Sequence, residues 1–259
     1  MGRHLGQHFL ANKEFAARIV EAASLTKDDI VLEIGPGRGI LTELILLRVK
    51  KLIVVEIDEK LVRHLYVKFP KAKNLEIIHK DFLKLGQLSD KNIKFIANMP
   101  YYITSPIIQK LISWPNWKKA VITVQKEVAD RISSKHGSRE YGVLTISINI
   151  KAAADRLFIV PRQNFMPRPK VDSAVVRLTP LTEKIIDPNE EKEFFKLVHA
   201  CFQQRRKVVA NSISHNLSIS KQDILKTLQK LDLSPQIRGE EIDLPTYLKL
   251  FQELRGYIT

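Results

Sequence analysis

Short, continuous apolar runs alternate with amphipathic stretches over the first two thirds of the chain. A continuous run, unlike one that alternates in polarity, is typical of a strand buried on both faces of a parallel sheet. The stretches between the runs repeat their apolar positions every three or four residues, which predicts helices. The predicted strands cover residues 30–34, 52–56, 75–78, 93–97 and 120–124. This alternation predicts an α/β fold with a Rossmann-like sheet.

The pattern changes near residue 182. Residues 180–188 begin and end with proline and are interpreted as a linker. Beyond the linker only helical spacing remains, with apolar positions grouped within 190–202, 224–231 and 244–254. The sequence therefore predicts two domains, an α/β domain over residues 1–182 and a small all-helical domain over residues 183–259.

The charge of the chain indicates what it binds. Its formal net charge is +14 and its pI is about 9.8, which favours a polyanionic partner because basic surface releases counterions from phosphate. The basic residues are spread along the chain rather than gathered on one amphipathic helix, so nucleic acid is favoured over a membrane. No apolar stretch is long enough to predict a membrane span.

Cysteine content and the first residues indicate the compartment. Cys201 is the only cysteine, which excludes an intramolecular disulfide and a cysteine-based metal site. Residues 1–6 lack the apolar core of a signal peptide. We therefore expect a cytoplasmic protein with no membrane partner.

A glycine-rich turn follows the first predicted strand. Residues 33–39 read Glu-Ile-Gly-Pro-Gly-Arg-Gly, with Gly35 and Gly37 at its centre. The dinucleotide fingerprint requires a further glycine at position 40, where this chain has Ile40, so an NAD site is disfavoured. The pattern is similar to the S-adenosylmethionine loop of Rossmann-like methyltransferases. A tight turn requires glycine in any case, so the loop alone is weak evidence.

Acidic side chains follow the next two strands. Glu56 ends the second strand, where an acid suits the two hydroxyls of a ribose, although a solvated carboxylate is the alternative. Asp81 follows the third strand and either accepts a hydrogen from an adenine amine or caps a helix. The fourth strand ends at Asn98. Because ligands of open α/β sheets lie at the carboxyl ends of strands, these side chains are expected to meet in one crevice.

Asn98-Met99-Pro100-Tyr101 suits the methylation of a planar exocyclic amine. The Asn98 side-chain oxygen and the Met99 carbonyl are placed to accept the two hydrogens of such an amine. Accepting them would draw the nitrogen lone pair out of conjugation and stabilise the positive charge that develops. Tyr101 would stack on the base. The alternative is a proline turn that closes a buried strand, with Asn98 capping the next helix.

Three further segments allow two interpretations each. In residues 164–173 two prolines hold Phe165 near Arg168 and Lys170, which suits a base-stacking platform with phosphate contacts. The local residues alone favour a phenylalanine buried beneath a proline turn. Residues 202–207 form a basic cluster, either a solvated helix end or a phosphate clamp, and residues 133–139 form either a mobile loop near the substrate or a plain connection.

Taken together, seven segments resemble one family, the small-subunit ribosomal RNA adenine dimethyltransferases of the kasugamycin-sensitivity type. The resemblance covers nearly the whole chain, and its segments are 6–10, 33–39, Glu56, Asp81, 98–101, 165–173 and 202–207. It implies a Rossmann-like class I S-adenosylmethionine-dependent methyltransferase domain followed by a helical domain. It also implies dimethylation of two adjacent adenosines in the 3′-terminal hairpin of the small-subunit RNA. The implied partners are the small ribosomal subunit and its RNA, with the enzyme acting as a monomer.

The resemblance assigns roles to individual residues. The implied contacts of S-adenosylmethionine are His8, Leu10, Gly35, Gly37, Glu56, Asp81 and Asn98. The implied catalytic residues are Asn98, Met99, Tyr101 and Phe165, with the target adenine between Tyr101 and Phe165. No metal or general base is required, because water can take the amine proton. The family often has asparagine where this chain has His8, so the contact at that position is uncertain in its chemistry, and Leu or Ile where it has Met99.

Two other functions fit parts of the same pattern. Erythromycin-resistance methyltransferases share the fold and the Asn-x-Pro-Tyr turn but act on large-subunit RNA, and the cluster at 202–207 favours the small-subunit family instead. A non-catalytic ribosome assembly factor on this fold is the second alternative. The intact loop at 33–39 and Asn98 argue against loss of catalysis.

Overall fold

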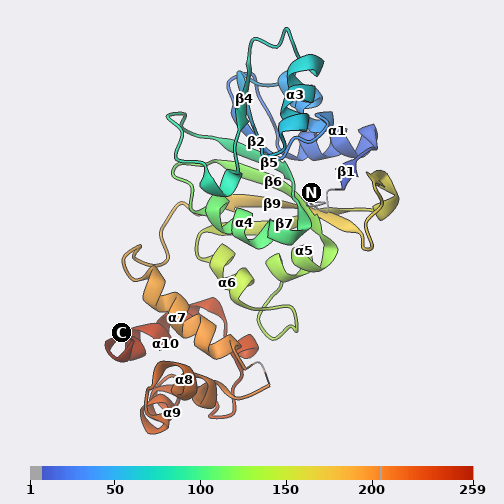
Figure 1. Ribbon diagram of the computed structural model, residues 1–259. Coiled ribbons are helices and arrows are strands. Elements are labelled where there is room, and N and C mark those ends of the chain that lie inside the picture. The colour runs from blue at the N-terminus through green and yellow to red at the C-terminus, as the bar shows by residue number, and fades with distance from the viewer. Residues whose placement is uncertain (1–7, 205, 259) are drawn as a thin grey trace. The chain divides into compact units, whose positions relative to one another are not determined.

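The computed structural model describes residues 8–204 and 206–258, and the chain forms two compact units. The first unit contains residues 1–129 and 152–180, and the second contains residues 130–151 and 181–259. Figure 1 colours the chain from its N-terminus to its C-terminus.

Residues 130–151 are the main difference from the predicted division. The sequence assigned them to the α/β domain, but Tyr141 and Ile146 belong to the apolar core of the second unit. No change in composition marks this excursion, because the chain leaves the sheet and returns to it within about twenty residues. The division of the chain into two domains that fold independently, 1–182 and 183–259, stays a prediction.

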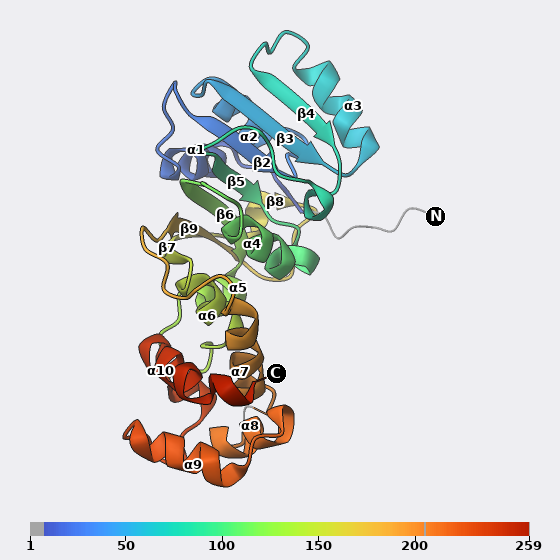
Figure 2. The same cartoon turned by 90° about the vertical axis from the view of Figure 1, so that its left-hand side faces the viewer.

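The first unit is built on a seven-stranded sheet with the order β4-β3-β2-β5-β6-β9-β7 (Figure 2). Its strands are β2 (Ile30–Ile34), β3 (Lys51–Glu56), β4 (Leu75–His79), β5 (Lys94–Asn98), β6 (Lys119–Gln125), β7 (Ala152–Val160) and β9 (Ser173–Pro180). The first five are parallel, and β9 runs antiparallel to β6 and β7. The chain runs outward from β2 through β3 to β4 and then returns to β5, which lies on the other side of β2. The topological switch point therefore lies between β2 and β5, at the carboxyl ends of these strands. The predicted α/β fold is confirmed.

Helices cover both faces of this sheet. They are α1 (Lys13–Ala22), α2 (Ile40–Leu46), α3 (Glu59–Lys68) and α4 (Thr104–Ile112), with the 3₁₀ helices η1 (Phe82–Lys84), η2 (Tyr101–Ile103) and η3 (Arg162–Asn164). Helix α5 (Lys126–Ile132) begins in the first unit and ends in the second. Alternate strand residues point to opposite faces. Val31 and Ile96 therefore pack with α1 and α2, whereas Phe95 lies against Phe82 and Trp114 at centroid distances of 6.4 and 5.7 Å.

A two-stranded sheet joins distant parts of the first unit. β1 (Phe9–Leu10) pairs with β8 (Phe165–Met166) in antiparallel register, Leu10 opposite Phe165. Leu10 and Phe165 are both buried. This pairing brings the N-terminal segment next to the loop that precedes β9.

The second unit is helical throughout its described residues. Its helices are α6 (Val143–Asn149), α7 (Glu191–Phe202), α8 (Val209–Leu217), α9 (Lys221–Lys230) and α10 (Leu244–Leu254), with the 3₁₀ helices η4 (Gly239–Glu241) and η5 (Arg255–Tyr257). Phe194 on α7 meets Phe251 on α10 edge to face, with ring centroids 5.7 Å apart. In the described ranges no helix combines the length and the apolar character that crossing a bilayer requires.

Candidate active site

Residues at the carboxyl ends of β2, β3, β4 and β5 line one cavity in the first unit. Of the residues predicted for the site, the cavity is lined by His8, Gly35, Gly37, Glu56, Asp81, Asn98, Met99 and Tyr101. Leu10 and Phe165 are buried beside it and do not line it. The convergence expected from the strand ends is therefore present in the structure.

Two glycines of the loop after β2 have different roles. Gly35 has a φ of +66°, and a Cβ added there would meet no atom within 4 Å. Gly37 has a φ of +56°, and an added Cβ would lie 2.8 Å from the ring of Phe9. Both positions favour glycine because a Cβ is strained at positive φ. Gly35 leaves open space in the cavity wall, whereas Gly37 allows β1 to pack on the loop.

Glu56 is held by backbone amides at the end of β3. It is 3% exposed, and its Oε1 accepts from the N–H groups of Ile57 at 2.9 Å and Asp58 at 3.0 Å. Oε2 accepts from the N–H of Gly37 at 3.2 Å. Burial raises the pKa of this carboxyl, and the three N–H groups oppose the rise. These bonds fix the carboxylate between two loops of the site.

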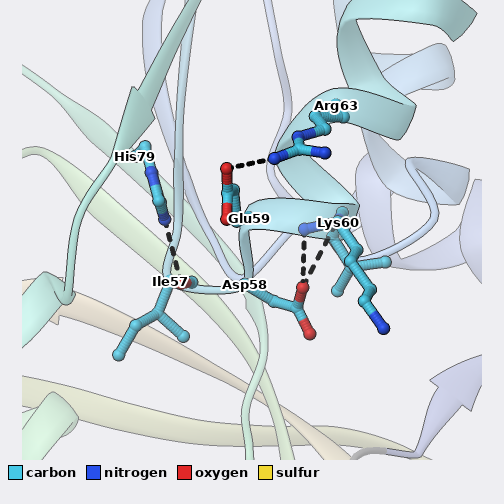
Figure 3. A network of polar contacts seen from close by, with 7 residues as sticks. Ile57, Asp58, Glu59, Lys60, Arg63 and His79 are labelled. Carbon is cyan, nitrogen blue, oxygen red and sulfur yellow. Dashed lines mark hydrogen bonds and ion pairs between the residues drawn. The ribbon is translucent and has the colours of Figure 1, made fainter.

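The turn after Glu56 is stabilised by local polar contacts (Figure 3). Asp58 caps α3 by accepting from the N–H of Lys60 at 2.8 Å, and His79 on β4 donates from Nε2 to the carbonyl of Ile57 at 3.2 Å. The turn thus places Ile57, which is largely exposed, at the cavity wall.

Glu33, the first residue of the glycine-rich turn at 33–39, is more deeply buried than Glu56. It is 1% exposed; its Oε2 accepts from the Thr42 hydroxyl at 2.7 Å. No described residue is a partner of its Oε1. Burial raises the pKa of Glu33 to about 8, the Thr42 hydrogen bond opposes this, and the nearby Glu56 adds to it. Glu33 supports the loop and does not line the cavity.

Asp81 begins the 3₁₀ helix η1. Its Oδ1 accepts from the N–H of Leu83 at 2.9 Å, so the capping interpretation is correct for this oxygen. Asp81 also lines the cavity. Lys110 on α4 holds the same turn by donating to the carbonyls of Leu83 at 2.8 Å and Leu85 at 2.5 Å.

Asn98 ends β5 with its amide oriented by the N-terminal segment. Nδ2 donates to the carbonyl of His8 at 3.0 Å. Because a carbonyl only accepts, this bond assigns the NH₂ group to that side and Oδ1 to the other. Oδ1 is buried and has no hydrogen-bond partner within the described ranges. Asn98 caps neither η2 nor α4, so the capping alternative is wrong.

Met99 and Tyr101 continue the turn. The N–H of Met99 donates to the carbonyl of Thr123 at 3.0 Å, which fixes the backbone that carries the Met99 carbonyl. The Tyr101 hydroxyl lies 2.7 Å from Oγ of Ser173, and its ring centroid lies 5.3 Å from that of His8. Burial raises the pKa of Tyr101, so the phenol is neutral at physiological pH.

Phe165 does not form the predicted stacking platform in this structure. It is 3% exposed and belongs to the core of the first unit. Opposite residues of β1 and β8 share a face, so Phe165 and Leu10 both point inward while Met166 is exposed. The arrangement matches the alternative, a phenylalanine beneath a proline turn, and it removes Phe165 from the proposed stack.

Several residues at the site were missed from the sequence. Tyr102, Ile57, Lys80 and Leu83 line the cavity, and Tyr102 is 57% exposed. Ser173 stood inside the quoted motif 165–173 but was given no role. In the sequence, the only indication of a role for Ser173 was its place at the start of a strand. Gly6 and Gln7 of the N-terminal motif and Arg205 of the basic cluster lie outside the described residues.

A mostly parallel sheet with this switch point, glycine loop, strand-end acids and Asn-Met-Pro-Tyr turn defines an α/β class I methyltransferase. A family described as "Ribosomal RNA adenine dimethylase" matches residues 2–254. The chain belongs to this family.

Individual relatives agree with this assignment. "Ribosomal RNA small subunit methyltransferase A" of Caldanaerobacter subterraneus subsp. tengcongensis is 39% identical over 96% of this chain and 95% of its own length. A crystal structure of a dimethyladenosine transferase from Plasmodium falciparum has a TM-score of 0.83 at 32% identity, covering 96% of this chain and 98% of that one. The 23S rRNA methyltransferase ErmE has a TM-score of 0.74 at 27% identity, covering 95% and 99%.

Proposed function

We propose that this enzyme dimethylates the exocyclic amines of two adjacent adenosines in the 3′-terminal hairpin of small-subunit ribosomal RNA, on the assembling subunit. S-adenosylmethionine is the proposed donor. The observation that carries the proposal is the buried Oδ1 of Asn98, a residue that lines the cavity, because the structure gives this acceptor no partner among the residues it describes. An exocyclic amine is a donor that satisfies it. The names of the relatives support the choice of RNA and of dimethylation.

The cavity suits S-adenosylmethionine. The open space at Gly35 admits a ligand close to the backbone, as the amino acid end of the cofactor requires. Glu56 would bind the ribose, because a carboxylate has about four acceptor sites and its backbone contacts occupy three. Asp81 would accept from the adenine amine. When bound, the cofactor supplies a methyl group activated by a positively charged sulfur.

Asn98 and Met99 would act on the target amine. Oδ1 of Asn98 and the Met99 carbonyl would each accept one N–H of that amine. These two bonds orient the nitrogen lone pair toward the methyl group and stabilise the positive charge on nitrogen. The nitrogen proton then leaves to water. After the first transfer the amine retains one hydrogen, so one acceptor is sufficient for the second.

Tyr101 is the aromatic residue proposed to contact the target base. It is half-buried at the cavity, whereas Phe165 is in the core. An adenine leaves its stack in order to enter such a pocket, and an aromatic ring offsets part of the lost stacking. Exposed Arg168 and Lys170, just after β8, would contact phosphate.

The test is methyl incorporation from labelled S-adenosylmethionine into under-methylated small subunits, with large subunits and free RNA in parallel. Mapping should locate dimethyladenosine at two adjacent positions near the 3′ end of the small-subunit RNA. The similarity to ErmE makes large-subunit RNA the second candidate, and label there would support it instead. Binding to small subunits without incorporation would favour an assembly factor.

A further inference from the structure

Tyr101 is held at its hydroxyl end by a residue with no assigned role. The 2.7 Å contact with Oγ of Ser173 is the hydrogen bond that the structure gives to this phenol. Ser173 is 0% exposed. A buried serine hydroxyl that meets a half-buried phenol satisfies both groups, and either oxygen can be the donor.

Topology explains why a residue 72 positions away reaches Tyr101. Ser173 is the first residue of β9, which is antiparallel to β6 and pairs Ser173 with Gln125, the last residue of β6. Because β9 runs opposite to β6, its first residue lies at the edge of the sheet where β6 and the other parallel strands end. Ser173 therefore lies at the catalytic edge although it begins its strand.

A second contact restrains the same ring. His8 lies at a centroid distance of 5.3 Å from Tyr101, with 30° between the ring planes. Its Nδ1 donates to the carbonyl of Pro167 at 2.7 Å, and its own carbonyl accepts from Asn98. Tyr101 is thus held by an imidazole at its ring and by Ser173 at its hydroxyl, next to the amide that is proposed to bind the target amine.

We propose that Ser173 is a positioning residue for methyl transfer and acts through Tyr101. Its hydroxyl anchors the phenol oxygen and so limits swinging of the side chain about its Cα–Cβ bond, while His8 packs against the ring, so that the ring presents one position to the incoming base beside Asn98. Small displacements of positioned groups cause large losses of rate. This inference rests on the proposed function, because it assumes that the base contacts Tyr101.

Matched variants separate positioning from folding. Ser173→Ala removes only the hydroxyl, Ser173→Thr restores it, and Tyr101→Phe removes its partner. Ser147→Ala deletes another buried hydroxyl that makes a hydrogen bond, in α6 of the second unit, and serves as the control. We expect Ser173→Ala to lower kcat for small-subunit methylation by roughly tenfold, as the loss of one hydrogen bond allows. The Kd for S-adenosylmethionine should stay within about twofold, and Ser147→Ala should retain kcat.

The double variant is the decisive comparison. If Ser173 acts through Tyr101, adding Ser173→Ala to Tyr101→Phe costs no further activity, and Ser173→Thr regains most of the loss. An equal loss in both backgrounds would overturn the inference, because Ser173 would then act independently of the phenol. So would a Ser173→Ala enzyme with unchanged kcat.

A measurement without activity keeps this test apart from the proposed function. In protein labelled with ¹³C-tyrosine, Tyr101→Phe identifies the signal of Tyr101 among the six tyrosines. Ser173→Ala should shift that signal and leave the others in place, whereas Ser173→Thr should restore it. An unmoved Tyr101 signal overturns the coupling even if the enzyme methylates RNA. A wild-type protein that methylates no RNA refutes the proposed function, and a shifted signal would still support the coupling.

Discussion

The carboxyl edge of the sheet keeps a cavity open, whereas the core of the helical unit is filled, although both units contain buried oxygens without a hydrogen-bond partner among the described residues. At the sheet edge Asn98 lines the cavity and has a buried side-chain oxygen without a partner among the described residues. In the helical core the space is filled by rings, with Phe194 edge to face with both Phe195 and Phe251. The first arrangement retains capacity to bind, and the second contributes to stability.

The difference has an energetic basis. A buried polar atom without a partner costs roughly 1 to 3 kcal/mol, so its retention requires another benefit, and a ligand that satisfies it supplies one. A buried aromatic side chain stabilises the fold by removing apolar surface from water. Substitutions at the sheet edge should therefore change function more than stability, and substitutions in the helical core should do the opposite.

The largest expected effect tests the sheet edge. Asn98→Ala should lower methyl transfer by about 10³-fold, because it removes an acceptor that stabilises the developing charge. RNA binding should stay within a few fold, since phosphate contacts supply most of it. Turnover on small subunits and a binding titration measure the two effects. Equal loss of both would show that Asn98 has a structural role like that of a core residue.

A substitution that should lower stability and leave cofactor binding unchanged tests the helical core. Phe194→Ala should lower the free energy of unfolding by about 3 kcal/mol, because Phe194 is fully buried and its removal leaves a cavity beside Phe195 and Phe251. The Kd for S-adenosylmethionine should change little, since every residue that lines the cavity belongs to the first unit. Phe195→Ala, at a half-buried neighbour, should cost less. Denaturant unfolding and calorimetry check this, and a lost cofactor site would contradict the separation.

A substitution of Glu33 tests whether a buried acid at the carboxyl edge of the sheet lowers the stability of the fold. Its pKa is raised from 4.5 to about 8 in the folded chain, so between these values the folded state binds more protons than the unfolded state. The stabilisation linked to this group is present below pH 4.5 and is lost as the pH rises toward about 8.

Glu33→Gln removes that titration. Without cofactor, its free energy of unfolding relative to the wild type should rise by roughly 4 kcal/mol across this interval. Unfolding curves at several pH values measure the difference. Parallel pH profiles of the two proteins would mean that Glu33 is ionised throughout, with a partner at its second oxygen.

The smallest effects concern the turn after β3. Asp58→Ala should cost about 1 kcal/mol of stability because it removes the N-cap of α3. Glu59→Ala, which removes only the exposed ion pair with Arg63, should produce no measurable change. Thermal unfolding of both variants distinguishes them. If Glu59→Ala were as costly as Asp58→Ala, capping would not be the reason for the difference.

The sequence by itself determined the order of the five parallel strands and the residues at their ends, but not β7 (Ala152–Val160). Continuous apolar runs specify buried parallel strands, and such strands bring Gly35, Glu56, Asp81 and Asn98 to one edge by geometry alone. The helical region after residue 182 was equally clear, because its apolar spacing has a single period. These features depend on local pattern, so they could be predicted.

Only the tertiary structure decided contacts between distant segments. The β1–β8 register turned Phe165 into the core, as the local residues had favoured and where the family resemblance had implied a contact with the base. The antiparallel start of β9 brought Ser173 to Tyr101, and the N-terminal segment oriented the amide of Asn98. Residues 130–151 joined the helical core without any change in composition. Such pairings depend on long-range register and on which face a side chain takes, and no local spacing in the sequence specifies them.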